Sequence, residues 1–368
     1  MDDLARCCCQ NSRCPDVGRR GAGNLTVTGR LGKHRQDRLL YCRRCRARFS
    51  ERKGTPLYRA HLPEDKVLSI LEHIAEGCGV LKTARLTKVH PDTVSPYGRV
   101  AGEHAGRLHD ELVAHSPATR AVQRDEKWSF VAKNQKNCDE DNPKDQFRGD
   151  CWDHLAFDPE HRLVLAVIPG ERTGATVQDL VQDVKERLDG RTPDLITTDE
   201  YAPYKEAILE VYGQEVVPPR TGKPGRPRKP YKVAPEGLHY ATVHKTRKKG
   251  RVVSVATRVI FGTVAAVQAA LANSTVSQVV NTALVERHNG TDRNRNARKA
   301  RKTYCFSKDW WIHRAVTFFT MDSYNFCWPV RTLRTEEGQE QTPAMTAGLT
   351  DHVWSLTEWL RRPVVQFG

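Results

Sequence analysis

The chain has 368 residues, of which 38% are hydrophobic, so it is long enough for two or three domains with cores of their own. Its 59 Lys and Arg residues outnumber 44 Asp and Glu residues, which gives a net charge of +15 and a pI near 9.4. This excess indicates a polyanionic partner, with nucleic acid the leading candidate, because bound phosphates release counterions.

The basic residues gather in three segments. Residues 1–60 hold 15 Lys or Arg against 5 acids, residues 214–260 hold 12 against 2, and residues 286–308 hold 8 against 2. The rest of the chain is therefore net acidic. This segregation predicts three separate contact zones on a more acidic body.

Cysteine placement and the apolar stretches argue against export and membrane insertion. Of the 11 Cys, four lie at or before Cys14 and two form a C-x-x-C, a pattern that suits metal binding in a reducing cytoplasm. The start, MDDLARCCCQ, has acids where a signal peptide needs basic residues. The longest apolar stretch, residues 259–272, is too short and interrupted to span a bilayer, so no membrane partner is expected.

Residues 1–60 are predicted to form a zinc ribbon. Cys9 and Cys14 are separated by four residues, and Cys42 and Cys45 by two. Two close Cys pairs joined by a long arm give Zn²⁺ four thiolates. Chance pairs of buried thiols are the alternative, but this polar segment has few apolar residues to fold around. Cys7 and Cys8 also compete for the first ligand position, and Cys9 is favoured because its spacing is shortest.

Residues 61–115 are predicted to be helical. From Glu64 onward, Val67, Ile70, Leu71 and Ile74 fall on one face, and Gly77 and Gly79 end the helix. A short helix, a turn at residues 89–91 and a second helix capped by Asp92 would then form a helix-turn-helix, with an ordinary helical hairpin as the alternative. Pro96 lies near the first turn of the second helix, where it is tolerated only at the earliest positions.

Strand-like runs begin after residue 120. Residues 128–133, 151–159 and 162–172 predict three successive strands, followed by a helix at 176–188 and an apolar strand ending at Asp199. This is the order of an RNase H-like α/β fold, a mixed sheet with helices, and residues 120–213 would form its first part.

Residues 214–275 are predicted to be a basic insertion. Its RTGKPGRPRKPYK segment resembles an AT-hook that lies in the minor groove, which makes Arg226, Arg228 and Lys229 candidate DNA contacts. A solvated Pro-rich linker explains the same residues equally well. The following residues predict a basic β-hairpin around a Lys-Gly turn.

Three acids are candidate metal ligands. The first strand of this fold lies beside the fourth, so Asp125, beside the first, and Asp199, ending the fourth, should meet. Glu286, on a later helix in residues 276–335, is the third. Carboxylates gathered in this way need divalent cations between them, and two Mg²⁺ (or Mn²⁺) ions about 4 Å apart would activate the attacking oxygen and stabilise the leaving one.

The basic segment after Glu286 supplies further candidate DNA contacts. Asn289 and Arg293 share a helix face with Glu286 and could touch the scissile strand. The other candidates in this segment are Arg298, Lys299, Arg301 and Lys302. Beyond it, residues 310–328 predict an apolar helix packed on the sheet, and residues 336–368 form a C-terminal tail.

Each acid also has a structural interpretation. Asp199 could cap a strand end, and Asp125 could be a surface charge. Glu126 and Glu200 are immediate neighbours of the two aspartates and could be mistaken for the functional acids. Neighbours along a strand point to opposite faces, so one of each pair can face the metals.

Taken together, these motifs resemble the IS-one family of insertion-sequence transposases. The similar elements, which cover most of the chain, are the Cys pairs with YCRRCRARFSERKGTPLY, the helix-turn-helix with AGEHA, RDEKWSFV, TTDEYAPY, and VERHN with RKARKTYCFSK. The interval between Asp199 and Glu286 holds 86 residues, longer than the compact spacing of the family.

The resemblance implies a DDE transposase acting on DNA in the bacterial cytoplasm, at the nucleoid. Such an enzyme binds inverted-repeat ends, cleaves them and joins the 3′-OH ends to target DNA, and its paired ends imply at least two protomers. The metal-binding acids carried over are Asp125, Asp199 and Glu286. A decayed or domesticated zinc-dependent DNA-binding protein is the main alternative, and an RNase H-like nuclease or resolvase is another.

Overall fold

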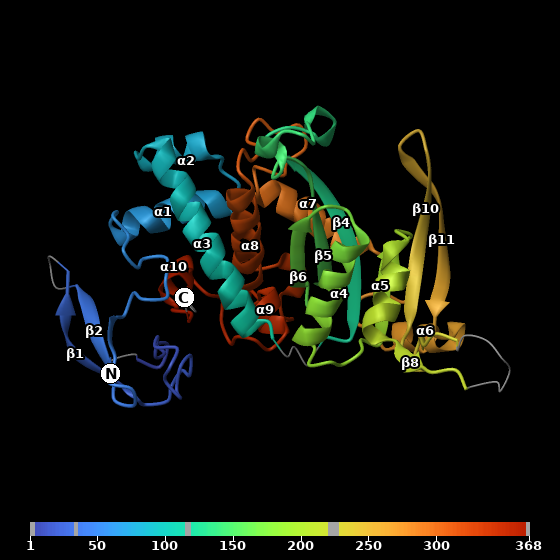
Figure 1. The fold of residues 1–368 in the computed structure, drawn as a ribbon, viewed down its shortest axis with the longest axis horizontal. Helices are drawn as coiled ribbons and strands as arrows, with labels where there is room; N and C mark the ends of the chain where they lie inside the picture. The colour runs from blue at the N-terminus through green and yellow to red at the C-terminus, as the bar shows by residue number, and fades with distance from the viewer. Residues whose placement is uncertain (1–3, 33–35, 115–118, 220–227, 366–368) are drawn as a thin grey trace. The chain divides into compact units, whose positions relative to one another are not determined.

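The computed structural model describes residues 4–32, 36–114, 119–219 and 228–365. It divides into two compact units (Figure 1). Unit 1 comprises residues 1–112, 293–330 and 352–368, and unit 2 comprises residues 113–292 and 331–351. Within the described ranges, no helix is both long and apolar enough to cross a membrane.

Unit 1 joins a small sheet to a group of helices. Its elements are β1 (Leu25–Leu31), β2 (Asp37–Cys42), β3 (Arg48–Ser50), α1 (Glu64–Ala75), α2 (Val80–Thr87), α3 (Pro91–Leu112), α8 (Trp310–Cys327) and α10 (Leu356–Arg361). The three strands form an antiparallel sheet in the order β1-β2-β3. Its small core consists of Leu25, Leu40 and Phe49 together with buried cysteines.

Helices α1, α2 and α3 occupy the segment in which a helix-turn-helix was expected. The apolar face expected for α1 is buried, since Val67, Ile70, Leu71 and Ile74 are at most 4% exposed. Helix α3 begins at Pro91, one residue before the expected cap Asp92, and continues through Pro96 for 22 residues. Proline at a first helical position needs no N–H partner, which explains this start.

Helix α8 packs against α3 within unit 1 (Figure 1). The two backbones approach so closely that a Cβ on Gly102 would lie 1.9 Å from the carbonyl oxygen of Ala315. Periodicity shows that a helix has a buried face, but not which surface covers it.

Unit 2 is built on a six-stranded sheet. Its strands are β4 (Ala121–Val131), β5 (Gly149–Asp158), β6 (Leu163–Gly170), β7 (Leu195–Asp199), β10 (Tyr240–Lys248) and β11 (Arg251–Phe261). Its helices are α4 (Gly174–Arg187), α5 (Pro203–Tyr212), α6 (Val264–Ala272), α7 (Ala283–Arg295, whose last three residues belong to unit 1) and α9 (Pro343–Thr346). Three 3₁₀ turns (Gln135–Asn137, Pro143–Asp145, Arg331–Leu333) and a small β8–β9 pair (Gln214–Val216, Tyr231–Val233) complete it.

The strand order is β11-β10-β7-β4-β5-β6. Strands β4, β5 and β6 pair antiparallel in succession, whereas β7 lies parallel to β4 and β10 parallel to β7. The first strand of the domain therefore lies beside the fourth, as expected, and the mixed sheet with its helices fits an RNase H-like fold.

The basic hairpin is part of this sheet. Strands β10 and β11 pair antiparallel, and β10 pairs with β7 over residues 240–243. The expected insertion at 214–275 therefore contributes two strands to the sheet and is not an independent addition. The far end of the hairpin lies beyond the residues paired with β7, and most of β11 is exposed.

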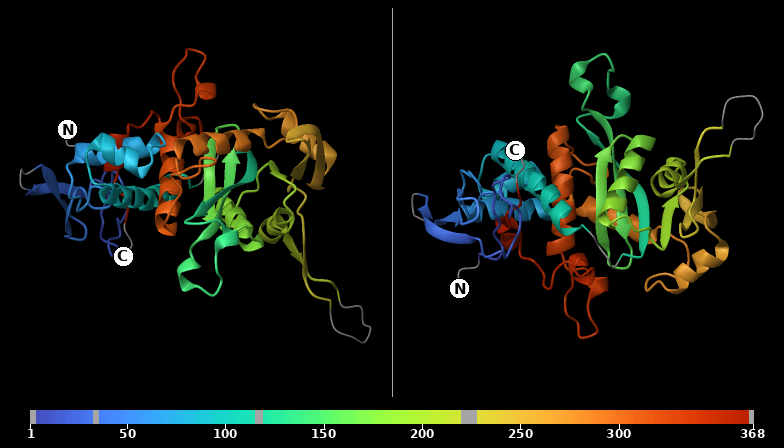
Figure 2. Two further views of the ribbon diagram at one scale, coloured as in Figure 1. Left: turned by 90° about the horizontal axis from the view of Figure 1, so that it is seen from above. Right: turned by 60° about the horizontal axis from the view of Figure 1, so that its bottom comes forward.

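The helices cover both faces of the sheet. Helix α4 contacts β5 and β6 on one face, and α5 packs beside α4, whereas α7 lies across the other face (Figure 2). Because strand residues alternate between faces, this layering decides which side chains of β4 and β7 can meet α7.

Candidate functional site

Asp125 and Asp199 lie on neighbouring parallel strands and point to the same face. The last paired residues of β4 and β7 are Gln123 and Thr197, and each aspartate lies two residues further on. Gln123 and Thr197 both donate to the backbone carbonyl of Asn281, which leads into α7. Alternation therefore directs both carboxylates toward the α7 side of the sheet.

A series of contacts holds α7 along β4. The backbone N–H of Val285 donates to Gln123 (3.0 Å), and the Asn289 amide donates to Asp125 Oδ2 (2.8 Å). Lys127 forms an ion pair with Asp292. The residues of β4 that point toward α7 thus contact successive turns of the helix. These contacts fix the position of α7 along β4 and place Asn289 beside Asp125.

Glu286 lies on the same helix but is engaged elsewhere. Its carboxylate accepts from Thr282 Oγ1 (2.6 Å) and forms an ion pair with Lys245 on β10. In the part of the chain that the structure describes, Asp125, Asp199 and Glu286 do not form a group whose carboxylate oxygens all lie within 4.8 Å of one another. The acids are therefore neighbours without being closed into one cluster.

The electrostatics of Asp125 reflect this neighbourhood. Burial raises its pKa, as do the negative charges of Asp199, Glu126 and Glu286, to about 7 in total. Carboxylate oxygens that repel one another are suitable ligands for Mg²⁺ or Mn²⁺, because a divalent cation removes the repulsion. The chemistry of these residues fits a divalent metal.

Glu126 and Glu200 lie away from α7. Glu126 is buried and pairs with Arg172 (3.1 Å), which stacks on the ring of Tyr201 (4.1 Å to the ring centroid). Glu200 is exposed and pairs with His244 (2.5 Å). Both glutamates therefore already have partners on the side of the sheet opposite Asp125.

Several expected DNA contacts are buried. Lys299 is 3% exposed and donates to Thr317 (2.6 Å), Arg298 is 8% exposed, and Asn289 is 3% exposed beside Asp125. In this conformation their side chains are not available to a DNA backbone, so this part of the expectation needs correction. Charge composition alone does not distinguish a buried from an exposed cation.

Other expected contacts remain accessible. Arg301 and Lys302 are exposed, as are Arg228 and Lys229, and Arg293 is half-buried. Arg226 lies outside the described residues.

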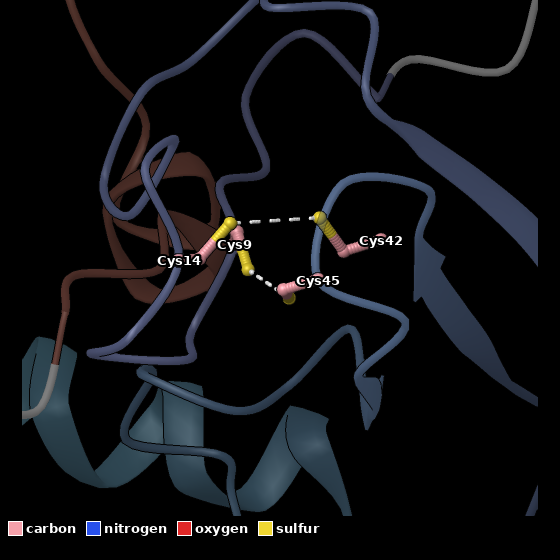
Figure 3. A group of neighbouring side chains, drawn as sticks. All are labelled: Cys9, Cys14, Cys42 and Cys45. Carbon is pink, nitrogen blue, oxygen red and sulfur yellow. Dashed lines mark hydrogen bonds between the residues drawn. The ribbon is translucent and has the colours of Figure 1, made fainter.

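Four cysteines of unit 1 form a second candidate centre. The Sγ atoms of Cys9, Cys14, Cys42 and Cys45 lie within 4.8 Å of one another and turn toward a common centre (Figure 3). The Cys9–Cys45 and Cys14–Cys42 sulfur distances are 3.6 Å and 3.9 Å. Tetrahedral Zn²⁺ with Zn–S bonds of about 2.3 Å requires sulfurs about 3.8 Å apart. The cluster therefore fits zinc.

The cluster also distinguishes among the three adjacent cysteines. Cys9 belongs to it, whereas Cys7 packs against the apolar core of the small sheet and Cys8 accepts from Gln10 (3.3 Å). Cys9 was favoured for its spacing, and the structure places its sulfur in the cluster.

Two lysines near the acids were not singled out by the sequence patterns. Lys127 lies two positions after Asp125 on the same strand. Because strand residues alternate between faces, Lys127 points to the same face as Asp125, and this could have marked it as a candidate site residue. Lys245 was counted only as a basic residue of the hairpin. Nothing in the sequence pairs it with Glu286, because that contact depends on β10 joining the sheet beside β7.

The fold and the site define a mixed α/β domain of RNase H-like strand order with adjacent acids on its two central strands. No family model and no curated protein matches the chain. Among solved structures it is similar to a Mos1 transposase paired-end complex with the left transposon end and to the Mos1 strand transfer complex.

These similarities are limited. Sequence identity is 15% and 16%, and the TM-score is 0.18 for both. The matches cover 42% and 41% of this chain and 57% and 56% of the Mos1 chains, so the chain spans less than two thirds of the proteins it matches. At such values the function has to be argued from the geometry of the site.

Proposed function

We propose that this protein is a DDE transposase of the IS-one insertion-sequence type. It binds the inverted-repeat ends of its element as a homo-oligomer of at least two protomers, cleaves them, and joins the 3′-OH ends to target DNA by transesterification. It works in the bacterial cytoplasm at the nucleoid. The zinc ribbon and helices α1 to α3 carry recognition of the ends, and unit 2 carries the chemistry.

One observation supports the proposal most. Asp125 and Asp199 extend from neighbouring parallel strands toward one face, and α7 carries Glu286 across that face. This arrangement gathers acids from three distant parts of the sequence where a DNA phosphate could approach. A divalent cation held by these acids would activate the attacking oxygen and stabilise the leaving one.

The test is a strand-transfer assay on the element's own ends with Mg²⁺. Asp125→Asn, Asp199→Asn and Glu286→Gln keep side-chain size and remove charge. Each should abolish cleavage and joining while end binding stays nearly unchanged, because recognition lies in other elements. Retained joining in any one variant would refute the role of that acid.

Glu200→Gln is the matched control. Glu200 is adjacent to Asp199 in sequence, exposed, and directed to the opposite face, so its loss should have a small effect. Glu126 is a poorer control, because its side chain is buried where it pairs with Arg172, so loss of stability is an expected side effect.

The same assay separates the alternatives. A wild type that binds its ends but never cuts would favour a decayed or domesticated zinc-dependent DNA-binding protein. A wild type that cuts without joining would favour a nuclease or resolvase.

A further inference from the structure

Lys245 occupies an unusual position beside the acids. It follows Val243 by two residues on β10, and Val243 pairs with Asp199 on the parallel strand β7. Residues aligned in a parallel pair point to the same face, and so does the residue two positions on. Lys245 therefore faces the side of the sheet on which Asp125 and Asp199 lie.

The ammonium group of Lys245 binds Glu286. Besides this ion pair, Lys245 Nζ donates to Thr282 Oγ1 (3.2 Å), and the same hydroxyl donates to Glu286 (2.6 Å). Thr282 is buried, whereas the side chains of Lys245 and Glu286 are 23% and 40% exposed. The pair thus lies at the solvent-facing edge of the site with a fixed hydroxyl beneath it.

This contact conflicts with metal binding by Glu286. A carboxylate oxygen held by an ammonium group repels a divalent cation that approaches the same oxygen. Lys245 and Thr282 both bind Oε1 of Glu286, so a metal that takes this oxygen displaces Lys245. Once released, Lys245 keeps its positive charge on the face that carries the acids, where a phosphate group of DNA would be a partner of opposite charge.

We propose that Lys245 pairs with Glu286 in the metal-free protein and binds a phosphate oxygen of the bound DNA strand once a divalent metal binds Glu286. This inference rests on the proposed function. It adds Lys245 as a substrate-contacting residue and makes metal and DNA binding mutually favourable, since each removes a partner of the ion pair.

The experiment has two readouts, both on the full-length, zinc-loaded protein. The first is Mn²⁺ binding without DNA, followed by electron paramagnetic resonance of the free ion. Lys245→Met should bind Mn²⁺ about threefold or more tightly than wild type, because an exposed ion pair no longer competes and a positive charge is gone. Lys245→Arg should behave like wild type.

The second readout is the single-turnover rate of end cleavage at saturating Mn²⁺ and DNA. Lys245→Met should cleave about tenfold or more slowly, as expected for loss of a charge on a reacting phosphate, and Lys245→Arg should recover most of the rate. Tighter metal binding combined with slower cleavage is an outcome that a merely structural ion pair does not produce.

Lys232→Met is the matched control. Lys232 pairs with Glu210 on α5, at a distance of 2.7 Å and with a side chain 32% exposed, and it belongs to no part of the site. It should change neither readout. Unchanged Mn²⁺ affinity or an unchanged cleavage rate in Lys245→Met would overturn the proposal.

Failure of this inference can be distinguished from failure of the proposed function. If Asp125→Asn abolishes Mn²⁺ binding while Lys245→Met leaves it unaltered, the metal site stands and Lys245 has no part in it. If wild type binds no Mn²⁺ that depends on Asp125, both ideas fail together.

Discussion

Lys127 lies two residues beyond Asp125 on β4 and forms a buried ion pair with Asp292 on α7. Asp153 on β5 lies 3.2 Å from the same ammonium group, so one lysine joins two strands and a helix. Burial would lower the pKa of Lys127, but the two aspartates hold it above its usual value. The lysine therefore stays charged and fixes the helix that carries Asn289 and Glu286.

We expect Lys127→Met to destabilise the protein strongly. Two aspartates would remain buried without their cation, and breaking a buried pair in this way costs about 3–5 kcal/mol. Urea denaturation at neutral pH measures the loss. Lys232→Met breaks an exposed pair and should cost at most about 1 kcal/mol. Equal losses in the two variants would contradict the role given to Lys127.

The cysteine cluster predicts about one zinc per chain. Cys9→Ser should lose the metal and unfold residues 1–60, because their small core cannot offset the chain entropy lost on ordering. Cys8→Ser should keep the metal, since its sulfur lies outside the cluster. Elemental analysis and tryptic digestion of the full chain test both. A folded, metal-free segment 1–60 would show the idea to be wrong.

Divalent metal binding should depend on pH through Asp125. Its pKa is raised to about 7, and only the ionised carboxylate binds a metal, so Mn²⁺ affinity should fall by up to about tenfold for each pH unit below 7. Titrations between about pH 5.5 and 8 measure this. A flat profile would mean that Asp125 is not a ligand.

The metal-free protein should show the opposite dependence in its stability. Between the unfolded pKa of Asp125, near 3.8, and about 7, the folded state holds the proton more tightly. The contribution of this group to stability is complete below about pH 4 and is lost as the pH rises through about 7. Asp125→Asn should remove that slope in urea titrations, and a persisting slope would assign it to other groups.

The end of the β10–β11 hairpin should contribute to DNA affinity. Lys248, Lys249 and Arg251 are exposed there. Replacing all three with Ala should reduce the slope of the logarithm of the binding constant against the logarithm of the salt concentration by about 0.9 for each phosphate that is no longer neutralised. Removal of residues 214–260 is unsuitable, because it would delete β10 and nearly all of β11, which are two strands of the sheet. The exposed pair Lys136 and Lys144, replaced in the same way, is the control. An unchanged slope in the hairpin variant would refute this role.

Local rules explain much of what the sequence predicted correctly. Strand alternation separated Asp125 from Glu126, and the strand order placed Asp125 beside Asp199, because these follow from short-range periodicity and from the connection rules of mixed sheets. The Cys spacing led to Cys9 for the same reason: ligands on two short turns are fixed locally.

Long-range packing explains the differences. Helix α8 has a clear apolar face, but only the assembled chain shows that α3 covers it. Arg298 and Lys299 are basic in sequence and buried in structure, because burial depends on neighbours that approach from distant segments.

The amino-acid sequence by itself determined the order of the first four strands of the domain, the two aspartates on one face and the four thiols, since each depends on spacing along the chain. Only the tertiary structure decided that β10 joins the sheet, that Lys127 ties α7 to β4, and that Lys245 holds Glu286. The residues of the Lys245–Glu286 pair are 41 positions apart in the sequence, and those of the Lys127–Asp292 pair are 165 positions apart. Spacing along the chain does not predict which charged residues meet over such separations, because these contacts depend on how distant segments pack.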